Sequence, residues 1–252
     1  MTVPQIGAFR KERFAGPVGD TTRRFDVYVR GAGPPIVVMQ ELPGIGQQVL
    51  LFADKLVNAG FEVWLPHMFG PLGKISMAGN AVRVLCMRRE FQLFSKHKSS
   101  AAVDWMRALC RHVRDARGAK GVGCVGMCLT GNFALAMIAD DAVLAAVASQ
   151  PSLPLRDETA IHMSDAEVAA SRAAIDVKGP MRAYRFEADA MCTGVRFAAI
   201  DKAFNDGAQR VILRTLPGAD HSVFARDFVD DGTGPTAQAL AEIIGYFGER
   251  LR

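Results

Sequence analysis

The sequence predicts an α/β protein with a mainly parallel central sheet and helices on both faces. Short apolar segments typical of strands alternate with segments whose apolar residues recur at helical spacing, which is the pattern of parallel strands joined by helical crossovers. Several strand segments are unbroken apolar runs, which indicates burial on both faces. The chain has 252 residues, half of them hydrophobic, so we expect a single domain over residues 1–252.

The first elements follow from alternation and periodicity. Apolar and polar residues alternate in residues 23–31, as in a half-exposed strand, and we expect an edge hairpin there. Residues 36–41 form an apolar run that ends in Gln-Glu, and we expect function at this carboxyl end. Residues 47–59 have helical spacing, and Gly60 is placed to cap the helix. Residues 61–66 are the next strand.

The middle of the chain predicts a long connection followed by a second buried strand. Residues 68–80 are rich in Gly and Pro and indicate a loop. Two helical patterns follow, over 81–95 and 99–116, and the second ends near a glycine. Residues 121–127 are a short apolar strand, and residues 129–139 are a helix.

The second half repeats the alternation after one interruption. Residues 142–150 are a strand, whereas residues 151–179 are polar, with a short helical pattern over 165–174. We interpret 151–179 as an excursion from the sheet or a pocket wall. The remaining elements are strands at 181–187 and 210–217 and helices at 194–205 and 235–251.

Composition excludes several classes of protein. Thirty basic and 26 acidic side chains leave a formal charge of +4, and no segment clusters basic residues with aromatics, so a nucleic-acid partner is not expected. The slight positive charge favours an anionic small molecule as substrate.

The chain has neither a secretory signal nor an apolar run long enough to cross a bilayer, which predicts a cytoplasmic protein without a membrane partner. We expect it to be a monomer or a small homo-oligomer. The five cysteines lack zinc-ligand spacing, so reduced thiols and no metal or cofactor are expected.

Residues 126–131 (Gly-Met-Cys-Leu-Thr-Gly) are the most informative local motif. They lie between an apolar strand and an apolar helix, which is the context of a nucleophile elbow, a strained turn that needs small neighbours. Gly126 and Gly131 meet that need, and the start of the helix favours the thiolate form of Cys128. The alternative is a buried structural cysteine. We assign that role to the other cysteines and the nucleophile's role to Cys128; the others are Cys86, Cys110, Cys124 and Cys192.

His221 and Asp189 are expected to complete a catalytic triad. His221 follows strand 210–217 in a Gly- and Asp-rich loop, where an imidazole can reach the thiolate over the sheet edge. Asp189 follows strand 181–187, where a carboxylate can orient that imidazole. Glu187 is the rival acid, but strand alternation points it elsewhere. The remaining histidines are less well placed; they are His67, His97, His112 and His162.

The order of nucleophile, acid and base is that of the α/β-hydrolase fold, and the chain resembles one family within it. That family is the dienelactone hydrolases (carboxymethylenebutenolidases), which use a cysteine. The resemblance covers nearly the whole chain and rests on IVVMQELPGIG, WLPHMFG, GMCLTG, FEAD and HSVFAR. It implies that an enol-lactone or activated ester is opened through an acyl-thioester intermediate.

The resemblance also implies roles for further residues. Glu41 would hold the resting thiol and help to take its proton when substrate arrives. The backbone N–H groups of Leu42 and Leu129 would form the oxyanion hole. Arg226, in HSVFAR, resembles an arginine that binds the substrate carboxylate. A second arginine would come from the helix after the Gly- and Pro-rich loop, where the candidates are Arg83, Arg88 and Arg89.

Two departures from the family pattern leave the substrate open. Val223 adds a residue between His-Ser and Phe-Ala-Arg, which changes the register of Arg226, and Thr130 stands where the family usually has Gly, which crowds the elbow. One alternative is a carboxylesterase or thioesterase of the same fold that acts on a different acyl group. The other is a noncatalytic relative that binds a small ligand.

Overall fold

A computed structural model of the chain describes residues 5–72, 101–152 and 158–252. Its strands are β1 (Arg10–Val18), β2 (Thr21–Arg30), β3 (Pro35–Met39), β4 (Glu62–His67), β5 (Val122–Met127), β6 (Val143–Ser149), β7 (Met181–Phe186) and β8 (Val211–Leu216). Its α-helices are α1 (Gln47–Asn58), α3 (Ala101–Arg117), α4 (Gly131–Met137), α5 (Asp165–Lys178), α6 (Gly194–Phe204) and α7 (Pro235–Leu251), and 3-10 turns lie at η1 (Ile6–Ala8) and η2 (Cys128–Thr130).

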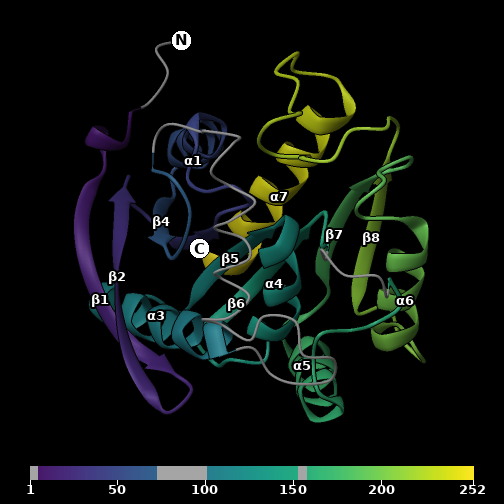
Figure 1. Ribbon diagram of the computed structural model, residues 1–252, viewed down its shortest axis with the longest axis horizontal. Coiled ribbons are helices and arrows are strands. Elements are labelled where there is room, and N and C mark those ends of the chain that lie inside the picture. Colours follow the sequence, from purple (N-terminus) through teal and green to yellow (C-terminus); the bar gives the residue numbers. More distant parts are fainter. Residues whose placement is uncertain (1–4, 73–100, 153–157) are drawn as a thin grey trace.

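The strands form one eight-stranded sheet in the order β1-β2-β4-β3-β5-β6-β7-β8 (Figure 1). β1 and β2 pair as an antiparallel hairpin at one edge, and β2 is also antiparallel to β4. All the other neighbours are parallel. The predicted edge hairpin and mainly parallel sheet are therefore confirmed. The first hairpin strand was not predicted, because most of β1 is exposed or half-buried and has no apolar run.

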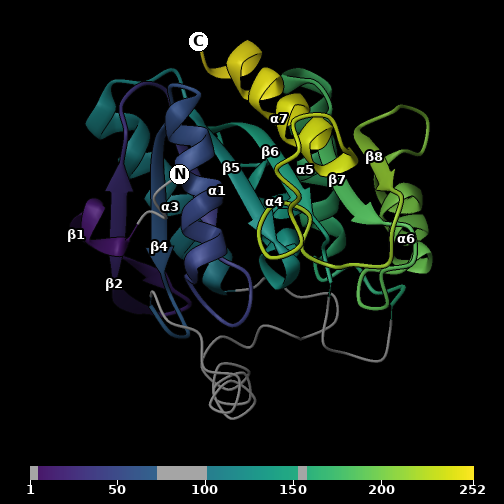
Figure 2. The ribbon, with the colours of Figure 1, turned by 90° about the horizontal axis from the view of Figure 1, so that it is seen from above.

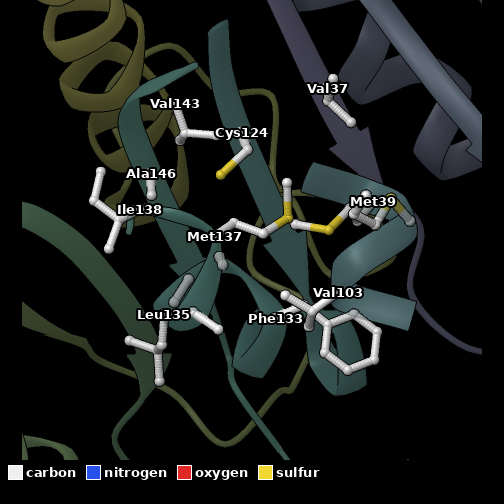
Figure 3. Packing of buried hydrophobic residues seen from close by; sticks show 14 of the residues in the cluster. Val37, Met39, Val103, Cys124, Phe133, Leu135, Met137, Ile138, Val143 and Ala146 are labelled. Atoms are coloured by element: carbon white, nitrogen blue, oxygen red, sulfur yellow. The ribbon is translucent and has the colours of Figure 1, made fainter. Parts of the chain in front are cut away.

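Helices cover both faces of the sheet (Figure 2). α1 and α7 pack on one face, where Phe52 and Phe247 belong to the same buried cluster. α3, α4, α5 and α6 lie on the other face and share a second cluster. Figure 3 shows part of that second core, in which Met137 of α4 lies near Cys124 of β5 and Phe133 lies beside Val103 of α3. The burial of both faces explains why the central strands are apolar at every position.

The strand order places a topological switch point between β3 and β5. From β3 the chain crosses to β4 on one side, and the later strands β5 to β8 extend on the other side. In open α/β sheets, ligands bind in the crevice at the carboxyl ends of the strands that flank such a point. Glu41 and Leu42 follow β3, and Cys128 follows β5, so the predicted site residues meet where this topology favours a site.

Differences between predicted and observed elements have local causes. Residues 151–179 include α5, which is the crossover helix between the parallel strands β6 and β7. α5 starts at a capping box, in which Ser164 Oγ accepts from the Glu167 N–H at 3.3 Å and the Glu167 carboxylate accepts from the Ser164 N–H at 3.0 Å. It runs four residues beyond the predicted 165–174, up to Gly179 at φ 87°. The predicted helix 81–95 lies outside the described residues.

Candidate active site

Cys128 lies in a left-handed turn directly after β5. Its φ is 56°, a conformation that costs a non-glycine residue free energy and is concentrated at functional sites. A Cβ at Gly126 would collide with the carbonyl oxygen of Thr130, and one at Gly131 would lie 2.8 Å from the carbonyl oxygen of Ser149. The two glycines therefore allow the strand and the following helix to approach as a nucleophile elbow requires. The Cys128 side chain is partly accessible.

Thr130 fits into this elbow through hydrogen bonds. Its side chain is buried, and its hydroxyl accepts from the Met127 N–H at 2.9 Å. The hydroxyl also lies 3.1 Å from the carbonyl oxygens of Met39 and Gln40, to which it can donate. The residue that departs from the family pattern thus ties the elbow to the carboxyl end of β3.

The change Thr130→Val tests the contribution of these hydrogen bonds, because valine keeps the shape of the side chain and removes the hydroxyl. The Met127 N–H would be left buried without its acceptor, which typically costs about 1–3 kcal/mol. We expect the free energy of unfolding, measured by urea denaturation, to fall by that amount. Thr215→Val, on an exposed position of β8, is the matched control and should change little. Equal stabilities of the two variants would contradict the assignment.

Asp189 and His221 form a close pair at the carboxyl ends of β7 and β8. Asp189 Oδ2 lies 2.7 Å from His221 Nδ1, and Asp189 Oδ1 accepts from the backbone N–H groups of Met191 and Cys192 at 2.8 and 3.0 Å. Burial raises the pKa of Asp189, but these hydrogen bonds outweigh it and lower the pKa. Glu187, the rival acid, is exposed. The carboxylate that contacts the imidazole is therefore that of Asp189.

The surroundings of His221 favour its protonated form. Burial of the ring lowers its pKa, but the hydrogen bond with Asp189 and the charges of Cys128 and Asp189 outweigh this and raise the pKa from 6.5 to about 10. His221 Nε2 is buried and accepts or donates no hydrogen bond among the described residues. The influence of Cys128 on His221 is therefore electrostatic.

The raised pKa of His221 predicts a pH dependence of stability. A group whose pKa is higher in the folded than in the unfolded protein stabilises the fold fully below the unfolded value of 6.5, and loses this contribution as the pH rises through about 10. We expect the stability difference between the wild type and His221→Asn to shrink across that window, as measured by urea unfolding at several pH values. When Asp189→Asn is introduced into both proteins, the stability difference between them should change less with pH. A difference that stays flat across the window would contradict the assignment.

Glu41 is buried, and its hydrogen bonds are with residues other than Cys128. Its carboxylate accepts from Ser222 Oγ at 2.8 and 2.9 Å and from Gln150 Nε2 at 3.1 Å. Burial raises its pKa, and the hydrogen bond from Ser222 only partly offsets this. The resting thiol of Cys128 contacts Ser152 Oγ at 3.1 Å, and no hydrogen bond joins it to Glu41 among the described residues.

Gln150, Ser222 and Ser152 were not predicted as site residues. Gln150 follows β6 with φ 32° and is fully buried; beyond Glu41, its side chain also contacts the backbone N–H of Val223 at 3.4 Å. Its place at a carboxyl strand end is a signal that could have found it. Ser222 is adjacent to His221 in the chain. No sequence pattern pointed to Ser152 as a site residue, because it lies in the polar segment that was interpreted as an excursion from the sheet.

The loop that carries His221 is held by Asp227. The Asp227 carboxylate accepts from the backbone N–H groups of His221 and Ser222 at 3.1 and 2.8 Å. It also pairs with Arg226, whose Nε lies 3.1 Å from Asp227 Oδ1 and whose side chain is 70% exposed. Arg226 lines a cavity of about 470 Å³ between α1 and α7, and neither Cys128 nor His221 lines that cavity. The predicted Arg83, Arg88 and Arg89 lie outside the described residues.

Leu42 and Leu129 place two backbone N–H groups beside the elbow. Leu129 is the second residue of η2 and Leu42 lies three residues after the end of β3, and both side chains pack in the core shared by α3 and α4. Leu42 lies outside the helices and strands, and its N–H donates to no backbone carbonyl among the described residues.

Residues 5–72, 101–152 and 158–252 contain neither a metal-binding cluster nor a helix that could span a membrane. No three His, Cys, Asp or Glu side chains in these ranges gather in an arrangement that could hold a metal ion. No helix there is long and apolar enough to span a bilayer. Cys110, Cys124, Cys128 and Cys192 are free thiols.

The sheet topology and the left-handed residue after β5 define an α/β-hydrolase fold. The sequence profile of the Dienelactone hydrolase family matches residues 26–250. The chain belongs to this family, and it is a hydrolase.

Solved structures agree with the fold. A dienelactone hydrolase from Anabaena variabilis is 15% identical with a TM-score of 0.59, over 97% of this chain and 100% of that one. A putative dienelactone hydrolase from Klebsiella pneumoniae is 15% identical with a TM-score of 0.62, over 95% of this chain and 99% of that one. A cold-adapted esterase from an Arctic intertidal metagenomic library is 15% identical with a TM-score of 0.62, over 97% of this chain and 95% of that one. No curated protein sequence matches the chain.

Proposed function

We propose that this hydrolase opens enol-lactones or activated esters, with Cys128 as nucleophile, His221 as acid and base, and Asp189 as the group that orients His221. One observation carries the proposal: a cysteine in a left-handed elbow raises the pKa of a histidine that is itself held at 2.7 Å by a buried aspartate. These are the elements of nucleophilic catalysis at a cysteine. The substrate is a small molecule, and the expected setting is a cytoplasmic monomer or small homo-oligomer.

In the acylation step, the Cys128 thiolate attacks the carbonyl carbon of the substrate. The bond between that carbon and the leaving oxygen breaks, and the oxygen departs with the electron pair. An enol-lactone suits this site because its oxygen leaves as an enolate, which takes up a proton without a strong general acid. For an ester of a simple alcohol, the His221 imidazolium gives its proton to the leaving oxygen. The product is an acyl-thioester on Cys128.

In the deacylation step, His221 takes a proton from water while the water oxygen attacks the thioester carbonyl. The bond to sulfur breaks, and the thiolate of Cys128 is restored. The charge of Cys128 helps to raise the pKa of His221, and that contribution is absent while the sulfur is acylated. His221 therefore changes from an acid to a base between the two steps because the charge beside it changes.

Both steps develop negative charge on the substrate's carbonyl oxygen. We assign its stabilisation to the backbone N–H groups of Leu42, after β3, and Leu129, in the turn after β5, which flank the elbow. Glu41 keeps its proposed role as proton acceptor from the thiol. Burial raises the pKa of its carboxyl, which suits proton transfer near neutral pH, but its side chain must first turn away from Ser222.

A second candidate is a carboxylesterase or thioesterase that acts on an uncharged acyl group. Arg226 favours it, because the guanidinium is paired with Asp227 and largely exposed instead of facing Cys128 and His221. On this reading the site does not need a substrate carboxylate. Arg83 and Arg88 remain candidates to bind that carboxylate under the first proposal.

A hydrolysis screen distinguishes the two candidates. Purified protein is assayed against a dienelactone and against p-nitrophenyl esters of uncharged acids, and Arg226→Ala and Arg88→Ala are assayed beside the wild type. Opening of the dienelactone, with a KM that rises in an arginine variant and unchanged KM for the neutral esters, supports the dienelactone proposal. Hydrolysis of the neutral esters alone supports the second candidate. Hydrolysis of neither class contradicts both.

A further inference from the structure

We infer that Ser152 is a further catalytic residue, whose hydroxyl donates a hydrogen bond to the Cys128 thiolate. This inference rests on the proposed function, since it assigns a partner to the proposed nucleophile. It begins from the contact of 3.1 Å between Cys128 Sγ and Ser152 Oγ. A hydroxyl at that distance touches the atom that forms and breaks bonds with the substrate.

The surroundings of the Ser152 hydroxyl favour a charged partner. The residue is buried, and among the described residues the Cys128 sulfur is the only hydrogen-bond partner of Ser152 Oγ. A buried hydroxyl is normally satisfied by at least one strong partner. A thiol is a weak partner, whereas a thiolate is a charged acceptor that makes hydrogen bonds about twice as strong. The hydroxyl therefore stabilises the thiolate more than the thiol.

The backbone of Ser152 is fixed so that the hydroxyl stays beside the sulfur. The Ser152 N–H donates to the Cys128 carbonyl oxygen at 3.2 Å, and the Ser152 carbonyl oxygen accepts from Asn132 Nδ2 at 3.0 Å. Asn132 Nδ2 also donates to the Leu129 carbonyl oxygen at 3.1 Å, and Asn132 Oδ1 accepts from the buried guanidinium of Arg196. This chain of bonds joins the residues after β6 to the elbow and preorganises the contact.

The same hydrogen bond serves both chemical steps. Before acylation it stabilises the thiolate form of Cys128, which attacks the substrate. In deacylation the carbon–sulfur bond breaks, the sulfur receives the electron pair, and the hydroxyl of Ser152 is already placed to stabilise the thiolate that leaves. Glu41 is engaged with Ser222 and Gln150, so Ser152 is the side chain that holds the thiol in this structure.

Other charges act on the same sulfur and must be separated from Ser152. His221, from the loop after β8, and Cys192, from the segment before α6, both interact electrostatically with Cys128. Ser152 carries no charge and does not titrate. Its removal should therefore displace the pH profile of Cys128 without adding or deleting a titration step.

The test is the pH dependence of Cys128 alkylation by iodoacetamide, with Cys128→Ala as the blank for other thiols. In Ser152→Ala we expect the midpoint of the profile to rise by about one pH unit and kcat/KM for a p-nitrophenyl ester to fall about tenfold at neutral pH, which is the usual value of a hydrogen bond to a charged group. Ser152→Thr keeps the hydroxyl and should keep the wild-type midpoint. Ser171→Ala, at a buried serine of α5, is the matched control and should also leave the midpoint unchanged.

Each outcome decides one of the two proposals. A Ser152→Ala profile that superimposes on that of the wild type, while Cys128→Ala is inactive, overturns the role of Ser152 and leaves the proposed function standing. Full activity of Cys128→Ala overturns the proposed function itself. If Ser152→Ala does not fold, Ser152→Gly removes the same hydroxyl and takes its place in the comparison with Ser152→Thr.

Discussion

Replacing Cys128 by serine is expected to lower kcat/KM for ester hydrolysis by at least about a thousandfold, because an alcohol is far less acidic than a thiol and His221 is arranged to pair with a thiolate. The charge of Cys128 helps to raise the pKa of His221 to about 10, and a neutral serine hydroxyl does not supply that charge, so the pairing of thiolate with imidazolium is lost. Cys128→Ala should lose the remaining activity. Initial rates with a p-nitrophenyl ester at saturating and limiting concentrations measure the effect.

The control for Cys128 is a cysteine that is remote from the site. Cys110 is a fully buried free thiol of α3, and Cys110→Ala should keep kcat/KM within a few-fold of the wild type. Circular dichroism and thermal unfolding establish that each variant folds. A serine variant as active as the wild type would contradict the proposed thiolate chemistry.

The second large effect is expected for Asp189→Asn, which should lower kcat by about a hundredfold to ten-thousandfold with little change in KM. An asparagine amide can donate to His221 Nδ1 and so stabilise the wrong tautomer, with the proton on the nitrogen that should face the substrate. It also removes the negative charge that helps to keep the pKa of His221 high. The variant should fold, because the amide is nearly isosteric with the carboxyl.

Glu187→Gln is the matched control for Asp189→Asn. Glu187 precedes Asp189 by two residues and is exposed, so the same change of acid to amide removes a charge without touching the imidazole. Its kinetic constants should equal those of the wild type. If Glu187→Gln loses activity and Asp189→Asn keeps it, the acid of the triad has been misassigned.

Most elements of the sheet and its helices could be predicted, because each follows from an apolar run or a helical periodicity in its own segment of the sequence. The unbroken apolar run at 121–127 matches β5, and the last helix was predicted with both observed ends, Pro235 and Leu251. The hairpin strand β1 was missed because its burial comes from pairing with β2 rather than from its own pattern. The length of α5 was underestimated because most of its residues are polar or exposed, and only a few, such as Ile175, are buried against the rest of the protein.

Positions near the site could be predicted where backbone geometry requires particular residues. Gly126 and Gly131 indicated the elbow because side chains there would collide with neighbouring carbonyl groups. The side-chain partners were harder to predict, because they depend on which loops meet over the sheet. Glu41 was expected at the thiol and contacts Ser222 and Gln150 instead. No local pattern in the sequence links Glu41 to these two residues, each of which is more than 100 residues from it in the chain.

The most direct test of the account is to identify the covalent intermediate. The protein is mixed with excess p-nitrophenyl acetate, quenched in acid during the first turnover, digested and analysed by mass spectrometry. We expect a burst of nitrophenol and one acetyl group on the sulfur of Cys128, and the adduct should be absent from Cys128→Ala. Acetyl transfer to a different side chain, or wild-type turnover with no adduct on Cys128 at any quench time, would contradict it.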